Sequence, residues 1–70
     1  MPPKIRQLKK ALARAGFNKR PGKGSHTKWI HPQFPAVFVN LSGNDGNDAK
    51  QYQIEDVKEA LREIGADDEL

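Results

Sequence analysis

Apolar residues recur at helical spacing at the start of the chain. They are Ile5, Leu8, Leu12 and Ala15, separated by three or four positions each. Residues at this spacing share one face of an α-helix. Pro3 precedes the stretch, where proline suits a helix entry, and Gly16 follows it as a stop signal. We expect a first helix between these two residues.

The middle of the chain has the composition of short β-strands separated by turns. Residues 17–20 can form a short strand, and Arg-Pro-Gly-Lys-Gly at 20–24 is typical of a turn. Residues 25–31 are rich in Thr, Trp and Ile and are followed by Pro32, while Pro35 precedes the strongly strand-like run 36–41. Three consecutive strands joined by short turns favour an antiparallel meander.

A second helical pattern follows a polar loop at 42–49. Its apolar positions are Ile54, Val57, Leu61 and Ile64, and Gly65 comes directly after them. We expect this helix to begin at about Gln51 or Gln53. The sequence therefore predicts an α+β fold of order α-β-β-β-α, a single domain over residues 1–70 with its core at about 4–64 and a frayed tail at 66–70. Two helices can cover only one face of the three-stranded sheet, so the other face is left bare.

Charge divides the chain into two parts. Residues 1–44 carry nine Lys or Arg and no acidic residue, whereas residues 45–70 carry three basic and nine acidic residues. A field of one sign attracts polyanions, and nucleic acid is the usual candidate. A solvated basic face that aids solubility is the alternative. The chain has no cysteine, no apolar stretch of membrane length and no secretory signal after Met1, which favours a cytoplasmic protein.

The only two histidines flank the only tryptophan of the chain. Alternation along a strand assigns His26, Lys28 and Ile30 to one face and Thr27, Trp29 and His31 to the other. We expect Trp29 to lie beneath the helices. His26 and Lys28 then lie on the bare face, beside Lys23 in the glycine-rich turn and Arg20 on the neighbouring strand.

This arrangement suits chemistry on a phosphate. Histidine exchanges protons near neutral pH, and lysines hold a phosphate and stabilise the charge that develops on it. The alternative from the pattern alone is that His26 is an exposed polar strand residue with no chemical role. The two histidines lie on opposite faces and cannot share a metal ion, and the loop at 43–48 lacks the closing Glu of a calcium loop. We expect neither a metal nor a cofactor.

The stretch 16–32, GFNKRPGKGSHTKWIHP, resembles the start of HicA-type toxins, small mRNA interferases of toxin-antitoxin systems. The matching positions are Gly16, Phe17, Lys23, Gly24, Ser25, His26, Trp29, His31 and Pro32. The resemblance covers about residues 4–64. Many members continue after the third strand with Val-Pro and a further histidine. This chain instead resembles a branch with an Asp-Ala-Lys-x-Tyr-Gln motif, here at 48–53.

The resemblance implies a fold like that of the double-stranded RNA-binding domain and metal-independent ribonuclease activity. It makes His26 the catalytic residue, mRNA the substrate and a HicB-type antitoxin the inhibitory partner. The residues expected to contact RNA are Arg20, Lys23, Gly24, Ser25, Lys28, Lys50 and Tyr52. Two alternatives stay open: an RNA-binding module without chemistry, with Phe38 available for stacking, and a subunit whose bare sheet face binds a protein. The sequence does not determine the oligomeric state.

Overall fold

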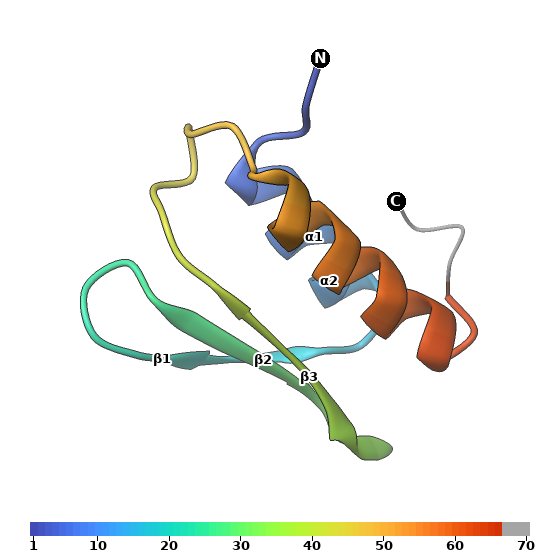
Figure 1. Cartoon of the computed structure of the whole chain (residues 1–70). Helices are drawn as coiled ribbons and strands as arrows, with labels where there is room; N and C mark the ends of the chain where they lie inside the picture. Colours follow the sequence, from blue (N-terminus) through green and yellow to red (C-terminus); the bar gives the residue numbers. More distant parts are fainter. Residues whose placement is uncertain (67–70) are drawn as a thin grey trace.

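The chain folds into two helices and three strands in the predicted order (Figure 1). The computed structural model describes residues 1–66. The elements are α1 (Ile5–Arg14), β1 (Asn18–Pro21), β2 (Thr27–His31), β3 (Phe34–Leu41) and α2 (Gln51–Glu63). The prediction of an α+β fold with α-β-β-β-α order is confirmed.

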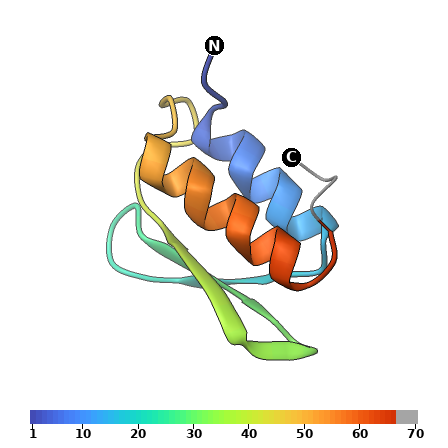
Figure 2. The ribbon, with the colours of Figure 1, turned by 45° about the vertical axis from the view of Figure 1, so that its right-hand side comes forward.

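The sheet is an antiparallel meander in which β2 lies between β1 and β3. Both helices lie side by side over the same face of this sheet (Figures 1 and 2). The other face is covered by no element of residues 1–66, as the sequence predicts. We call it the bare face below.

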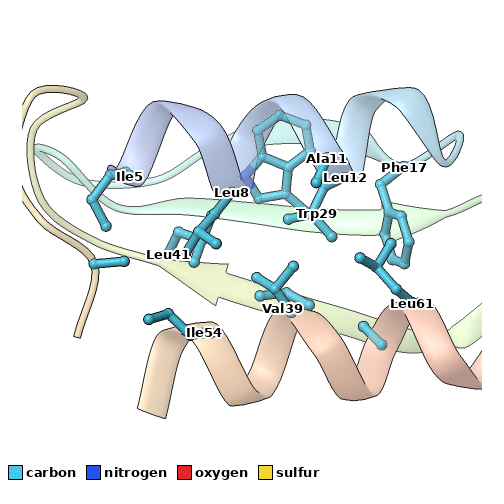
Figure 3. Close-up of a cluster of buried hydrophobic side chains, with 13 residues drawn as sticks. Ile5, Leu8, Ala11, Leu12, Phe17, Trp29, Val39, Leu41, Ile54 and Leu61 are labelled. Carbon is cyan, nitrogen blue, oxygen red and sulfur yellow. The ribbon is translucent and has the colours of Figure 1, made fainter. Parts of the chain in front are cut away.

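The core lies between the helices and the covered face of the sheet (Figure 3). On β2, Trp29 is buried whereas Lys28 is exposed, so the predicted alternation along this strand is confirmed. The indole N–H of Trp29 donates to Thr27 Oγ1 at 3.1 Å, which satisfies its one polar atom. The buried apolar residues are Ile5, Leu8, Ala11, Leu12, Phe17, Trp29, Val39, Leu41, Ala49, Ile54, Val57, Ala60 and Leu61.

Each helix begins directly after a lysine. The backbone N–H of this lysine donates a hydrogen bond to the side chain of a glutamine three residues later. The Lys4 N–H donates to Gln7 Oε1 at 2.6 Å, and the Lys50 N–H donates to Gln53 Oε1 at 2.9 Å. These bonds reproduce the glutamine half of a capping box and satisfy backbone donors that a helix start leaves free. Gly16, with a φ of +99°, follows α1 as the sequence predicts.

The first two strands begin later than predicted. β1 starts at Asn18, because Phe17 turns into the core and is only 4% exposed. β1 also includes Pro21, which the sequence assigns to the turn. β2 starts at Thr27, because residues 22–26 form a tight turn stabilised by its own hydrogen bonds.

The third strand begins earlier than predicted, at Phe34, and includes Pro35. Proline is compatible with this position because β3 is an edge strand, where the missing N–H need not break a ladder hydrogen bond. The pairing register of β2 and β3 shifts between Ile30 and His31, which accommodates the additional residues of β3.

Within residues 1–66, neither helix has the length and apolar character needed to cross a membrane. The predicted frayed tail lies outside the described residues except for Ala66, which packs against the core. The single domain over residues 1–70 stays a prediction.

Candidate functional site

The turn between β1 and β2 presents His26. The backbone N–H of His26 donates to the Lys23 carbonyl at 3.0 Å, and the N–H of Gly22 donates to the His26 carbonyl at 2.9 Å. Gly24 occupies the first central position of this four-residue turn with a φ of +61°, which a side chain would strain. The glycine therefore fixes the backbone on which the histidine is mounted.

Gly22 allows a close approach of the chain to His26. A Cβ at position 22 would lie 3.0 Å from the His26 carbonyl oxygen and 3.3 Å from the His26 Cβ. A side chain at this position would require the turn around His26 to shift by a few tenths of an ångström. The His26 side chain itself is exposed, and no residue among 1–66 forms a hydrogen bond with its ring.

Ser25 connects the turn to the loop that follows β3. Its Oγ accepts a hydrogen bond from the Gly43 N–H at 3.0 Å. The neighbouring Ser42 carbonyl in turn accepts one from Gln53 Nε2 at 3.0 Å, and Gln53 is only 3% exposed. Ser25 therefore anchors the turn to the start of α2, a role that the sequence does not indicate.

Two ion pairs hold the same loop against α1. Lys9 Nζ contacts Asp45 Oδ1 at 2.6 Å, and Lys4 Nζ contacts Asp48 Oδ1 at 2.5 Å. The hydrogen bond and the positive charge of Lys9 lower the pKa of the Asp45 carboxyl. The loop is thus held against both helices. The Gly43 N–H that donates to Ser25 therefore has a fixed position.

Basic side chains extend from the turn across the bare face. Arg20 on β1 and Lys28 on β2 are direct cross-strand partners, so their side chains lie on the same face as predicted. Both residues are exposed, as is Lys23 in the turn. The strands contain no Asp or Glu, so no acidic residue of the sheet neutralises this charge.

His31 has a different environment from His26. It is 8% exposed, its Nδ1 accepts the Gln33 N–H at 3.1 Å, and its Nε2 lies 3.1 Å from the Ala15 carbonyl. Because Nδ1 is an acceptor, the neutral ring with its proton on Nε2 satisfies both partners. The rings of Phe17 and Phe34 contact it edge-on, with centroids at 5.3 and 5.1 Å. Both ring nitrogens of His31 are engaged in holding the structure.

The remaining predicted contacts lie at the start of α2. Lys50 is exposed and lines a pocket of about 170 Å³ together with Gly43, the hydrogen-bond partner of Ser25. Tyr52 is 54% exposed on α2. Sequence reasoning missed Gln53 as the residue that joins this helix to the loop, although a Gln three positions after an N-cap is a recognisable capping signal.

A larger groove lies on the other side of β3. It has a volume of about 310 Å³ and is lined by Phe38, Val39 and Asn40 of β3 and by Asp56, Glu59, Ala60 and Glu63 of α2. Its three carboxylates oppose the binding of a polyanion. The basic candidate site therefore comprises the turn and the bare face. It ends at this groove along β3. Within residues 1–66, no three His, Cys, Asp or Glu side chains form a group suited to a metal ion.

Comparison with known proteins gives one family. The family described as HicA toxin of bacterial toxin-antitoxin matches residues 5–66, which is almost the whole chain. No curated protein matches this sequence.

Proposed function

This chain belongs to the HicA toxin family of bacterial toxin-antitoxin systems, and on that premise we propose that it is an mRNA-cleaving endoribonuclease with His26 as its catalytic residue. Its site of action is the cytoplasm, where mRNA is present. The proposed site comprises His26, the turn that carries it and the basic residues beside it.

The contrast between the two histidines is the observation that carries the proposal. His31 is buried with hydrogen-bond partners at both ring nitrogens, so it has no free nitrogen for substrate. His26 is exposed on a turn that two glycines shape. A general acid or base must reach the proton that it transfers, which only His26 can do here.

The proposed reaction is transfer of a phosphoryl group within the RNA. The ribose 2′-oxygen attacks the adjacent phosphorus, the bond from phosphorus to the 5′-oxygen breaks, and a 2′,3′-cyclic phosphate and a 5′-hydroxyl form. His26 either takes the proton from the 2′-hydroxyl while water protonates the leaving 5′-oxygen, or gives a proton to the 5′-oxygen while water accepts the proton of the 2′-hydroxyl. Such a group typically contributes about a hundred- to ten-thousandfold in rate.

In this proposal the phosphate is bound by Lys23, Lys28 and Arg20. They are exposed, they lie on the turn and on the adjoining strands, and their charges would offset the negative charge that grows on the phosphoryl oxygens. Gly24 and Ser25 hold the turn in place. Lys50 and Tyr52 would contact the RNA chain farther away, at the start of α2.

The test uses purified protein and end-labelled RNA in the presence of EDTA. We expect cleavage of unmodified RNA and a 5′-hydroxyl on the downstream fragment. RNA with a 2′-deoxy or 2′-O-methyl ribose throughout should resist cleavage because it lacks the nucleophile. Cleavage of the 2′-deoxy strand would contradict the proposed reaction, and an absence of all fragments would favour a binding module without chemistry.

We further propose a HicB-type antitoxin as the protein partner. A bare sheet face on a domain of 70 residues leaves surface that a partner can bury, and covering it would shield His26 and its basic neighbours together. Co-expression with the product of the adjacent gene should raise the melting temperature and suppress cleavage. If that product neither binds nor changes the melting temperature, the proposed partner is wrong.

A further inference from the structure

The bare face combines basic, amide and apolar side chains. The strand register places Asn18 and Arg20 of β1, Lys28 and Ile30 of β2, and Phe38 and Asn40 of β3 on this face. Lys28 is directly opposite Arg20 on one side and Asn40 on the other. None of the six is acidic, so the face suits a negatively charged ligand that also offers flat apolar surfaces.

Phe38 is the exposed aromatic residue of this face. It is 51% exposed, and the Lys28 ammonium lies 4.8 Å from the centre of its ring. Its cross-strand partner Ile30 is half-buried, so packing around the ring leaves much of it open to solvent. A phenylalanine left open to solvent beside lysine and asparagine can receive a nucleic-acid base on its ring.

The groove between β3 and α2 limits how far an anionic ligand can extend across this face. Phe38 and Asn40 line both the bare face and the groove, whose other wall carries Asp56, Glu59 and Glu63. A phosphate backbone is attracted across β1 and β2 and repelled beyond β3. Phe38 therefore lies at the boundary between attraction and repulsion, where a base rather than a phosphate is the favoured contact.

We propose that Phe38 is a base-stacking subsite for single-stranded RNA, an inference that rests on the proposed function of His26. Phe38 pairs with Ile30, which is three residues beyond Thr27, the first residue of β2 after His26, so about 10–13 Å separate Ile30 from His26 along the chain. A stacked strand advances about 3.4 Å per nucleotide and an extended one advances farther. The stacked base therefore lies about two to four nucleotides from the phosphate at His26.

Binding requires Lys28 to exchange one contact for another. Its ammonium leaves the Phe38 ring for a phosphate oxygen, and the base takes the vacated place on the ring. A cation over an exposed aromatic ring is a weak interaction, whereas each base stacked on an aromatic residue strengthens binding by roughly 5- to 150-fold. The exchange favours the RNA complex.

A duplex does not satisfy this geometry, because its bases are stacked on each other and paired. Only an unpaired base can turn its flat face to Phe38. The proposed subsite therefore selects single-stranded over double-stranded RNA.

The experiment compares the same substitution on the two faces of the sheet. Phe38→Leu removes the ring from the bare face, and Phe34→Leu removes a ring that contacts His31 instead. The probe is a short, fluorescently labelled single-stranded RNA with 2′-O-methyl groups, which cannot be cleaved by attack of the 2′-oxygen. We expect Phe38→Leu to weaken binding by about fivefold or more, the lower end of the stacking range, and Phe34→Leu to change it by less than about twofold.

A series of probes, each with an abasic site at a different position, identifies the base that stacks on Phe38. One abasic position should weaken binding to the wild type and have no effect on binding to Phe38→Leu. Thermal unfolding of both variants, together with cleavage of unmodified RNA by the wild type, completes the measurement. Phe38→Trp should bind at least as tightly as the wild type.

Unchanged affinity of Phe38→Leu would overturn the subsite, and cleavage by the wild type would show that the proposed function survives that result. Tighter binding of a duplex of the same sequence would also overturn it. So would a Phe38→Leu variant that keeps its RNA affinity but loses the antitoxin, because the face would then be a protein interface. A wild type that neither binds nor cleaves RNA would refute the proposed function itself.

Discussion

Substitution of His31 by alanine should severely destabilise this protein. The substitution removes a hydrogen bond at each ring nitrogen and two edge-on aromatic contacts. At about 1 kcal/mol for each hydrogen bond and about 0.5–1.5 kcal/mol for each aromatic contact, the expected loss is about 3–5 kcal/mol. A chain of 70 residues has a total stability of only about 4–10 kcal/mol. His31→Ala should therefore lose about 30% or more of its stability.

Urea denaturation monitored by the fluorescence of Trp29 measures this loss. Trp29 is the only tryptophan and is buried in the core, so its emission reports global unfolding. His31→Gln provides a milder variant, because its amide can still donate to the Ala15 carbonyl. We expect it to be destabilised less and to cleave RNA at the wild-type rate once corrected for its folded fraction.

Two results would refute this interpretation of His31. One is a His31→Ala protein that unfolds within about 0.5 kcal/mol of the wild type, which is the range of ordinary surface substitutions. The other is a folded His31→Gln protein that has lost cleavage, since that would assign the chemistry to the wrong histidine.

Three other predictions follow from the turn, the bare face and the loop. Gly24→Ala forces a side chain into a φ of +61°, so we expect a loss of about 1 kcal/mol in unfolding experiments and slower RNA cleavage, because His26 is displaced. Lys28→Glu should weaken RNA binding far more than Lys58→Glu on α2, and it should flatten the salt dependence of the affinity; equal effects in a binding titration would contradict the charge division of the chain. Because the pKa of Asp45 is lowered in the folded state, its stabilising contribution is present at neutral pH and lost on acidification below about pH 4. Acid unfolding of Asp45→Asn should therefore show a smaller loss of stability over that range than the wild type, and identical acid profiles would contradict this.

Much of the fold was predictable because its signals are local. The spacing of Ile5, Leu8 and Leu12 predicts α1, and alternation along β2 predicts that Trp29 is buried while Lys28 is exposed. Both follow from the period of the secondary structure, which any buried face imposes on a sequence. The cross-strand pair of Arg20 and Lys28 follows from the short turn between their strands.

What the sequence did not predict depends on contacts between distant residues. Pro35 lies inside β3 because that strand is at the sheet edge, and the edge position emerges only from the topology. The hydrogen bond between Ser25 and Gly43 joins residues 18 positions apart in the sequence. The ion pair of Lys4 with Asp48 joins residues 44 positions apart. No local pattern contains such pairs.

The site was predictable in part for the same reason. The glycines at 22 and 24 indicate a turn, and the turn brings Lys23 and His26 together. The engagement of both nitrogens of His31 could not be predicted, because it depends on the ends of α1 and of the β2–β3 hairpin. That engagement is what distinguishes the two histidines.

The most direct test of the central claim is the cleavage rate of His26→Ala in EDTA, measured beside its unfolding in urea. The His26 ring is exposed and forms no hydrogen bond with any residue of 1–66, so its removal should leave the unfolding midpoint within the error of the wild type. The rate should fall by about a hundred- to ten-thousandfold. A His26→Ala protein that is equally stable and cleaves RNA at the wild-type rate would contradict the assignment of His26 as the catalytic residue.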